Sequence, residues 1–154
     1  MMQYDACHEN STGATVVQIS RLDNDLIHIR PNSARRLKNK TSERVLQLVG
    51  YARTAMVQAM SQADDDWLFP QYIKAGHCYA THASNAVNKW LKKDFGGLTV
   101  HCLRHTFRDR LRAIECPTDV IDQIGGWSRK GVGESYGRGY QVEQLWAWMV
   151  RAVG

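Results

Sequence analysis

The chain has 154 residues, with 20 Lys and Arg against 15 Asp and Glu, which gives a net charge of +5. Hydrophobic residues make up 44% of the chain, enough for one domain core, and the 23% charged fraction excludes wholesale disorder. No apolar run approaches the ~20 residues that span a bilayer, and the polar N-terminus excludes a signal peptide. We therefore expect one domain over residues 1–154 that works in the cytoplasm, away from any membrane.

The N-terminal third shows strand patterns. Residues 1–13 are polar and carry no clear pattern, whereas the apolar positions within 16–22 indicate a half-buried strand or a short helix. Residues 26–30 are typical of a strand, because Leu, Ile, His, Ile and Arg are followed by Pro and Asn. Residues 43–48 alternate polar and apolar side chains and predict the returning strand. The basic stretch 33–42 is then the hairpin between the two strands.

After Gly50 the periodicity is helical, and glycines or prolines separate the segments. Residues 67–70 look like a short buried plug, and residues 128–139 look like a mobile loop. Thr99 is the predicted N-cap of the third helix, and Pro117 the first residue of the fourth. Helices are expected at 51–63, 80–93, about 100–115, 117–124 and 142–153. The sequence thus predicts a mostly α fold with a small antiparallel sheet near the N-terminus.

Three of these helices should bury an apolar face. In helix 80–93 that face holds Ala83, Ala86, Val87, Trp90 and Leu91. In the third helix it holds Leu103, Phe107, Leu111 and Ile114. In the last helix it holds Val142, Leu145, Trp146, Met149, Val150 and Val153.

The four cysteines, at positions 7, 78, 102 and 116, are expected to be reduced, because a chain of this size needs no disulfides. A zinc site drawn from His77, Cys78, His82, His101, Cys102 and His105 would lack the C-x-x-C spacing of common structural sites. We therefore expect neither a metal nor another cofactor.

Basic residues fall into two blocks. The first consists of Arg30, Arg35, Arg36, Lys38, Lys40 and Arg44, and the second of Arg104, His105, Arg108, Arg110 and Arg112. Such blocks suit a polyanion, although each one alone is equally compatible with a solvated face.

Spacing within the C-terminal half points to metal-free phosphoryl transfer. His101 and Arg104 lie three residues apart on one helix face, with Trp127 23 residues after Arg104 and Tyr136 nine beyond. A phenol can attack a phosphodiester, and a guanidinium offsets the charge on its oxygens. The imidazole can handle a proton, the indole N–H can bind the phosphate, and a hairpin lysine can protonate the leaving oxygen.

Plainer interpretations exist for the same residues. Tyr136 and Tyr140 are compatible with ordinary loop aromatics, and the spacing from Trp127 favours Tyr136 as the functional one. Trp127 can serve as a core residue that closes the turn. His105 is expected to be a buried structural histidine.

Together these residues resemble the tyrosine recombinases, the family of phage and genomic-island integrases, over residues 12 to 153. The resemblance rests on HCLRHTFRDRLR (101–112), which resembles the family's His-x-x-Arg box, on IGGW (124–127), and on the distance to Tyr136. LIHIRPNSARRLKNKTSERVLQLVG (26–50) is similar to the family's strand, hairpin and strand. The resemblance implies a nucleophilic Tyr136, a second catalytic arginine at Arg104, and phosphate contacts from His101 and Trp127. It also implies a hairpin lysine at Lys38, with Lys40 as the near alternative.

The resemblance implies a site-specific DNA recombinase (integrase) domain that cleaves and rejoins DNA through a 3′-phosphotyrosine. Because the bond energy is kept in that intermediate, neither ATP nor a metal is required. Double-stranded DNA is the implied partner, and helix 142–153 would dock onto a neighbouring protomer. The chain contains only the catalytic-type domain, without the upstream DNA-binding domain, so we expect weak DNA affinity with a steep salt dependence.

The chain departs from the family pattern at its first arginine. Thr12-Gly13-Ala14 is followed by Thr15 where the family has that arginine, and Gln18 takes the acidic position. By analogy with other phosphoryl-transfer arginines, such a loss costs about 10³–10⁵ in rate. The alternatives are a recombinase-derived DNA-binding domain with impaired or lost catalysis, an alignment that is wrong in this block, or a helical regulator without phosphoryl chemistry.

Overall fold

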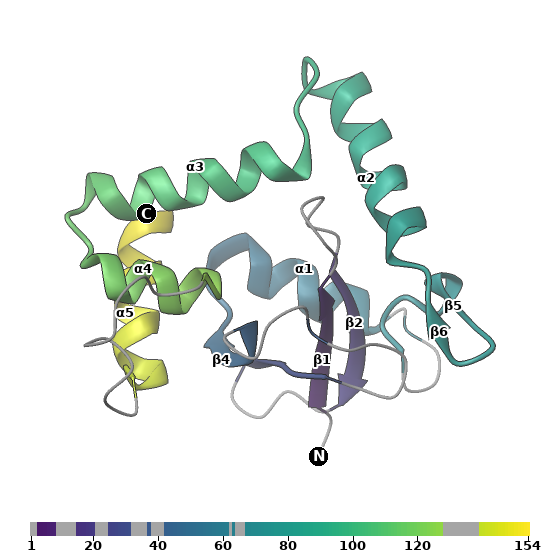
Figure 1. Cartoon of the computed structure of the whole chain (residues 1–154), viewed down its shortest axis with the longest axis horizontal. Coiled ribbons are helices and arrows are strands. Elements are labelled where there is room, and N and C mark those ends of the chain that lie inside the picture. The colour runs from purple at the N-terminus through teal and green to yellow at the C-terminus, as the bar shows by residue number, and fades with distance from the viewer. Residues whose placement is uncertain are drawn as a thin grey trace.

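A computed structural model describes residues 3–8, 15–20, 25–31, 37, 42–61, 63, 67–127 and 139–154, with the backbone alone for 3–8 and 15–20. The strands are β1 (Gln3–His8), β2 (Thr15–Ser20), β3 (Leu26–Ile29), β4 (Arg44–Gln47), β5 (Ile73–Lys74) and β6 (His77–Cys78). The helices are α1 (Gly50–Ser61), the 3₁₀ helix η2 (Pro70–Tyr72), α2 (Ala80–Asp94), α3 (Val100–Ala113), α4 (Thr118–Gly125) and α5 (Val142–Val153). The predicted mostly α fold with a small sheet near the N-terminus is confirmed (Figure 1).

The N-terminal sheet has the strand order β2-β1-β3-β4. The expected hairpin is confirmed, because β3 and β4 pair antiparallel from Leu26↔Gln47 to Ile29↔Arg44. β1 and β2 form a second antiparallel pair, and the single parallel register Asp5↔His28 joins the two pairs. β1 lies within the polar stretch 1–13, for which no element was predicted, and it contains no β-branched side chain.

The main core forms where α3, α4 and α5 meet β4. Its buried side chains are Leu111, Cys116, Val120, Ile121, Ile124, Leu145, Met149 and Ala152, and Leu46 of β4 packs against them. A smaller cluster around Ile29 and Leu68 lies between the sheet, the residue Leu37 and α1. The plug around Leu68 is thus buried as expected, at 4% exposure. Figure 1 shows α5 beneath α3 and beside α4, at one end of the molecule.

α2 buries a different face from the predicted one. Ala83 and Leu91 are buried, but Val87 and Trp90 are 41% and 52% exposed. The buried face instead includes Ser84, whose Oγ accepts a hydrogen bond from the side-chain amide of Asn88 at 3.3 Å.

α3 and α5 bury only part of their predicted faces. On α3, Leu111 is fully buried, whereas Leu103 near the start is 49% exposed, so the first half of the helix projects beyond the core. On α5, Leu145 and Met149 are buried in the core, whereas Trp146 and Val150 remain exposed. In the described part of the chain, no helix has the length and apolar character needed to cross a membrane.

Helix α3 is fixed at its start by a neighbour rather than by its own cap. Thr99 occupies the N-cap position, as predicted, but its side chain makes no capping bond and its hydroxyl meets Cys102 Sγ at 3.3 Å. The backbone N–H of Val100 instead donates to Asn88 Oδ1 at 2.9 Å. At α4, Pro117 is the N-cap and not the first helical residue, because its ψ of 139° is extended.

Candidate active site

The site is organised around α3, which carries His101 and Arg104. The helix is anchored by Leu111 in the core and by Asn88 at its first N–H. Its interior is free of glycine and proline, so it forms a continuous scaffold. Side chains three positions apart share one side of such a helix, as predicted for this pair.

Arg104 and Trp127 are brought together, as predicted. Nη2 of Arg104 donates to the carbonyl oxygen of Gly125 at 3.1 Å, and its guanidinium carbon lies 4.6 Å from the Trp127 ring centroid. Arg108, one turn further along α3, places its guanidinium 4.7 Å from the same centroid and contacts Asp122 at 3.4 Å. Trp127 is therefore tied to α3 by two cation–π contacts, each worth about 0.5–1 kcal/mol at a partly exposed site.

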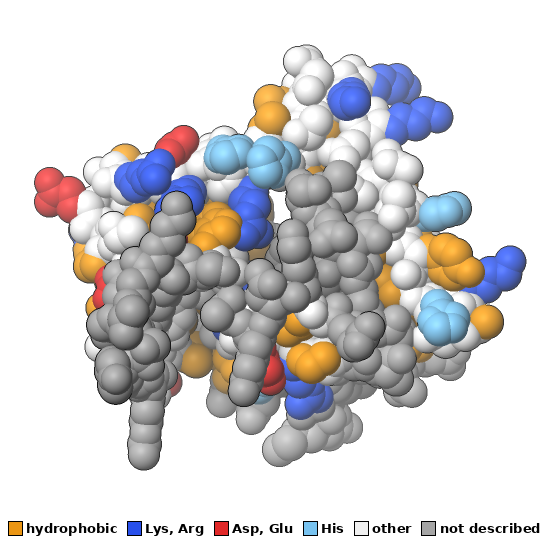
Figure 2. Space-filling view, in the orientation of Figure 1, with side chains coloured by type: hydrophobic (Ala, Val, Ile, Leu, Met, Phe, Trp, Pro, Cys, Tyr) orange, Lys and Arg blue, Asp and Glu red, His pale blue; other side chains and the backbone are white. Residues whose placement is uncertain are grey.

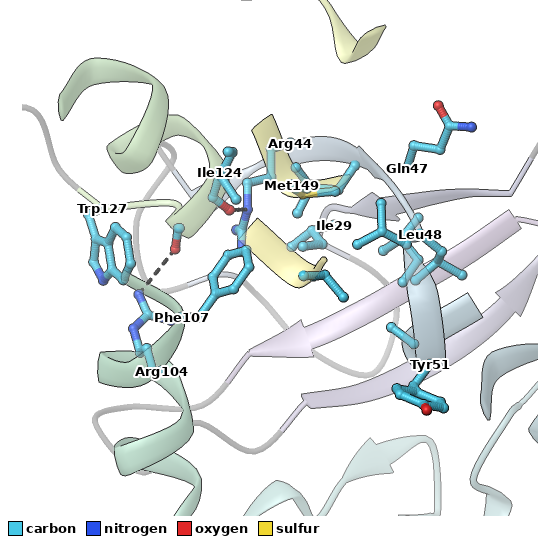
Figure 3. A pocket seen from close by; sticks show the side chains of 16 residues that line it. Ile29, Arg44, Gln47, Leu48, Tyr51, Arg104, Phe107, Ile124, Trp127 and Met149 are labelled. Atoms are coloured by element: carbon cyan, nitrogen blue, oxygen red, sulfur yellow. Dashed lines mark hydrogen bonds between the residues drawn. The ribbon is translucent and has the colours of Figure 1, made fainter. Parts of the chain in front are cut away.

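Two consecutive glycines allow this packing. A Cβ atom at Gly125 would lie 2.1 Å from the Trp127 ring. A Cβ atom at Gly126, whose φ is +64°, would lie 2.4 Å from Nη1 of Arg44. The pair therefore ends α4 and also admits an indole and a guanidinium into van der Waals contact with the backbone (Figure 3).

Arg44 is a further residue at the site, which the sequence analysis placed only in the first basic block. Its Nε donates to the carbonyl of Ile124 at 2.9 Å and its Nη1 to the carbonyl of Ser42 at 2.7 Å. The alternative that the first basic block is a solvated face is wrong for this residue, since its side chain is partly buried. The available signal was the strand alternation, which puts Arg44 on the same face as the core residue Leu46.

The region is strongly positive. Burial, with a smaller contribution from Arg104, lowers the pKa of Arg44 to about 10. Burial likewise lowers the pKa of Arg104, with a smaller contribution from Arg108. Among the described residues, Asp122 is the one carboxylate that pairs with any of these three guanidiniums. Positive charge without matching carboxylates is suited to an anionic ligand.

His101 lies on the surface of α3 rather than in a pocket. Its Nε2 is 2.9 Å from Nε2 of His105, and the two rings meet edge to face with centroids 4.4 Å apart. The prediction that His105 is buried is wrong, because this residue is exposed and forms a pair with His101. The i,i+4 spacing was the signal for the contact. Figure 2 shows histidine side chains together over α3, beside Lys and Arg side chains.

Tyr140 is held in a structural role. Its hydroxyl donates to Asp119 Oδ2 at 2.5 Å, and its backbone N–H and C=O both bond the side-chain amide of Gln123, at 2.8 and 2.9 Å. It also packs against the main core. These contacts give Tyr140 a structural role that requires no catalytic function, and Tyr136 stays the candidate nucleophile.

Several predicted site residues lie outside what the structure describes. These are Tyr136, Lys38 and Lys40, together with the side chains of Thr15 and Gln18. Their roles therefore stay predictions. In the sequence, the nearest described residues are Trp127 and Gly139 around Tyr136, and Leu37 and Ser42 around Lys38 and Lys40.

An apolar pocket of about 430 Å³ lies behind the arginines. Arg44, Arg104 and Trp127 contribute to its wall, and the rest of its lining comes mainly from β3, β4, α1 and α5 (Figure 3). The low-polarity wall explains why the two guanidiniums have lowered pKa values, since a poorly hydrated cation is destabilised.

Comparison with known proteins identifies the class. The profile of the phage integrase family matches residues 12–141, so the chain belongs to the phage integrase family, the tyrosine recombinases. The predicted resemblance is thereby confirmed. Proteins of this family are site-specific recombinases that act on and bind DNA, and the chain shares that general assignment. No significant match to a curated protein or to a solved structure was found.

Proposed function

We propose that the chain is a catalytic-type domain that cleaves and rejoins DNA through a 3′-phosphotyrosine intermediate. The observation that supports this most is the packing of Arg104 and Trp127 on the end of α4. It places a guanidinium beside an indole in a region with excess positive charge. From the DNA substrate alone, we further propose that the protein acts in the cytoplasm.

The proposed reaction is an in-line transfer. The Tyr136 oxygen attacks the phosphorus, the new tyrosyl O–P bond forms, and the bond to the 5′ oxygen breaks. The phenolic proton passes to water, and Lys38 supplies a proton to the departing 5′ oxygen. Arg104 and Trp127 bind the non-bridging oxygens, and His101 donates to one of them. Rejoining reverses these steps with a different 5′ hydroxyl, so no external energy source is consumed.

Described residues that neighbour Tyr136 and Lys38 in the sequence are anchored in the fold. Gly139 follows Tyr136 by three residues in the sequence. Gly139 is packed closely on α4, because a Cβ there would lie 2.9 Å from Gln123 Oε1. Lys38 directly follows Leu37, which packs against the cluster of Ile29 and Leu68.

A second candidate function is a DNA-binding domain with impaired or lost catalysis. The observation that favours it is Thr15 in place of the family's first arginine, with Gln18 at the acidic position. Loss of one guanidinium from a phosphate site weakens transition-state stabilisation far more than it weakens binding of the DNA backbone.

A suicide substrate separates these functions. The full chain is incubated with nicked duplexes drawn from a library of candidate sites, and covalent adducts are detected on a denaturing gel. An adduct that disappears in Tyr136→Phe but persists in Tyr140→Phe supports the enzyme. Binding of duplex DNA without adduct in the wild type supports the second function, and then Thr15→Arg should raise the adduct yield. Absence of DNA binding at low salt would contradict both.

Assembly on DNA through the last helix is also a proposal. The inner face of α5 packs on the chain's own core through Leu145 and Met149, whereas Trp146 and Val150 stay exposed. We propose that these exposed side chains meet a neighbouring protomer. Trp146→Ser should reduce the order of complexes on DNA in a gel-shift assay without reducing single-protomer binding.

A further inference from the structure

The two imidazole rings on α3 form a surface pair whose geometry suggests a second use. Nε2 of His101 lies 2.9 Å from Nε2 of His105, with the ring planes at 87°. Both residues are exposed, and they lie one turn apart on a helix of 14 residues. The helix therefore holds two imidazole nitrogens on an exposed face, within reach of one ion.

We propose that His101 and His105 form a two-point clamp for a divalent transition-metal ion, with Cu²⁺ bound most tightly. Imidazole nitrogens bind such ions at about 2.0–2.1 Å, so nitrogens 2.9 Å apart subtend about 90° at the ion. That angle is found between neighbouring ligands in square-planar and octahedral sites. A tetrahedral zinc site would need the nitrogens about 3.3 Å apart. Among ions that accept the square or octahedral geometry, Cu²⁺ has the highest affinity for nitrogen ligands.

Metal binding would replace the hydrogen bond between His101 and His105 by two nitrogen–metal bonds. Without metal, one Nε2 carries the proton that the other Nε2 accepts. With metal, both Nε2 lone pairs point at the ion, and the ring that had donated carries its proton on Nδ1. The protein neither gains nor loses a proton, so the exchange requires only a tautomer change and a small ring rotation.

The surroundings make the ion exchangeable. In the part of the chain that is described, no third His, Cys, Asp or Glu residue joins the pair as a ligand. Arg104, immediately before His105 in the sequence, adds positive charge that weakens binding of a cation. The clamp is therefore a regulatory or inhibitory site and not a resident cofactor site.

The clamp would act on the proposed recombination, and this consequence depends on that function. An ion on Nε2 of His101 occupies the atom proposed to contact the phosphate. Cu²⁺ should therefore reduce adduct formation, and a chelator should restore it.

The clamp itself is tested without DNA. The full chain is titrated with Cu²⁺ in a non-coordinating buffer by calorimetry, and the electron paramagnetic resonance spectrum reports the number of nitrogen ligands. The variants are His101→Gln, His105→Gln and the double variant. His82→Gln is the matched control, because His82 is an exposed histidine on α2. All variants change exposed side chains, and circular dichroism verifies that each is folded.

Because the clamp requires both imidazoles, the Cu²⁺ affinities of the variants should follow a distinctive pattern. Even partners outside the ligand shell change metal affinity by about 10–100-fold, so either single variant should lose at least about tenfold. The double variant should lose more than either single one but less than the sum of the two losses, and His82→Gln should match the wild type with two nitrogens in the spectrum. Equal affinity in His105→Gln and wild type, or losses that add in the double variant, would overturn the proposal. Cu²⁺ binding without loss of adduct would support the clamp and contradict the proposed role of His101 in cleavage.

Discussion

Replacement of Gly126 by alanine tests how tightly Arg44 is fitted against the end of α4. Gly126 and Gly96 have the same φ of +64°, but a Cβ at Gly96 would meet nothing within 4 Å, whereas one at Gly126 would lie 2.4 Å from Arg44 Nη1. Gly96→Ala therefore measures the cost of the left-handed backbone alone. The difference between the two variants measures the displacement of the guanidinium.

The expected magnitudes follow from the contacts. A non-glycine residue in the left-handed region costs about 1–2 kcal/mol, so Gly96→Ala should lose that much stability. Gly126→Ala should also lose Arg44's bonds to Ile124 and Ser42, each worth about 1.5–3 kcal/mol for a charged donor. Part of this loss is offset, because the displaced guanidinium regains water.

The net expectation is that Gly126→Ala is less stable than Gly96→Ala by about 1–3 kcal/mol. Urea unfolding monitored by circular dichroism gives both free energies, and equal m-values show that the denatured state is unchanged. Equal stability of the two variants would refute the close fit of Arg44 on the glycine. A double variant, Gly126→Ala with Arg44→Met, should recover part of the difference, because the clash is removed.

Three further predictions concern single side chains. Arg104→Lys keeps the charge but loses the planar contacts, so the adduct rate should fall by about 10²–10³-fold while duplex affinity changes little in a gel-shift assay. Tyr140→Phe removes the hydroxyl bond to Asp119 and should cost about 1–3 kcal/mol in urea unfolding, with adduct formation intact. The hydrogen bond with Thr99 lowers the pKa of the Cys102 thiol, so more thiolate is present below the usual thiol pKa and alkylation should begin at lower pH. Thr99→Val should shift that alkylation profile upward, and an unchanged profile in mass spectrometry would contradict the bond.

Periodicity predicted most of the helices and the β3–β4 hairpin because their core-facing residues carry a strong apolar signal. Local spacing also predicted the proximity of Arg104 to Trp127, although their contact depends on how α4 ends. β1 was not predictable in this way, since a polar strand is defined by the neighbour it pairs with. The inward face of α2 was missed for a similar reason, because the contact of Asn88 with the Val100 N–H of α3 depends on the tertiary fold.

Arg44 lies at the site although the sequence motifs that predicted the site assigned it no role there. The motif predicts one guanidinium beside the indole, whereas the structure holds two on consecutive carbonyls, with Arg104 on Gly125 and Arg44 on Ile124. The C-terminal end of a helix carries partial negative charge, so it can hold cations in the absence of a ligand. A carbonyl oxygen carries only a partial negative charge, so it neutralises a guanidinium less than a phosphate would. The two arginines therefore keep positive charge available for DNA. Arg44 would then offset part of the charge that Thr15 does not supply, which is why its contribution is best measured in the wild-type background and in Thr15→Arg side by side.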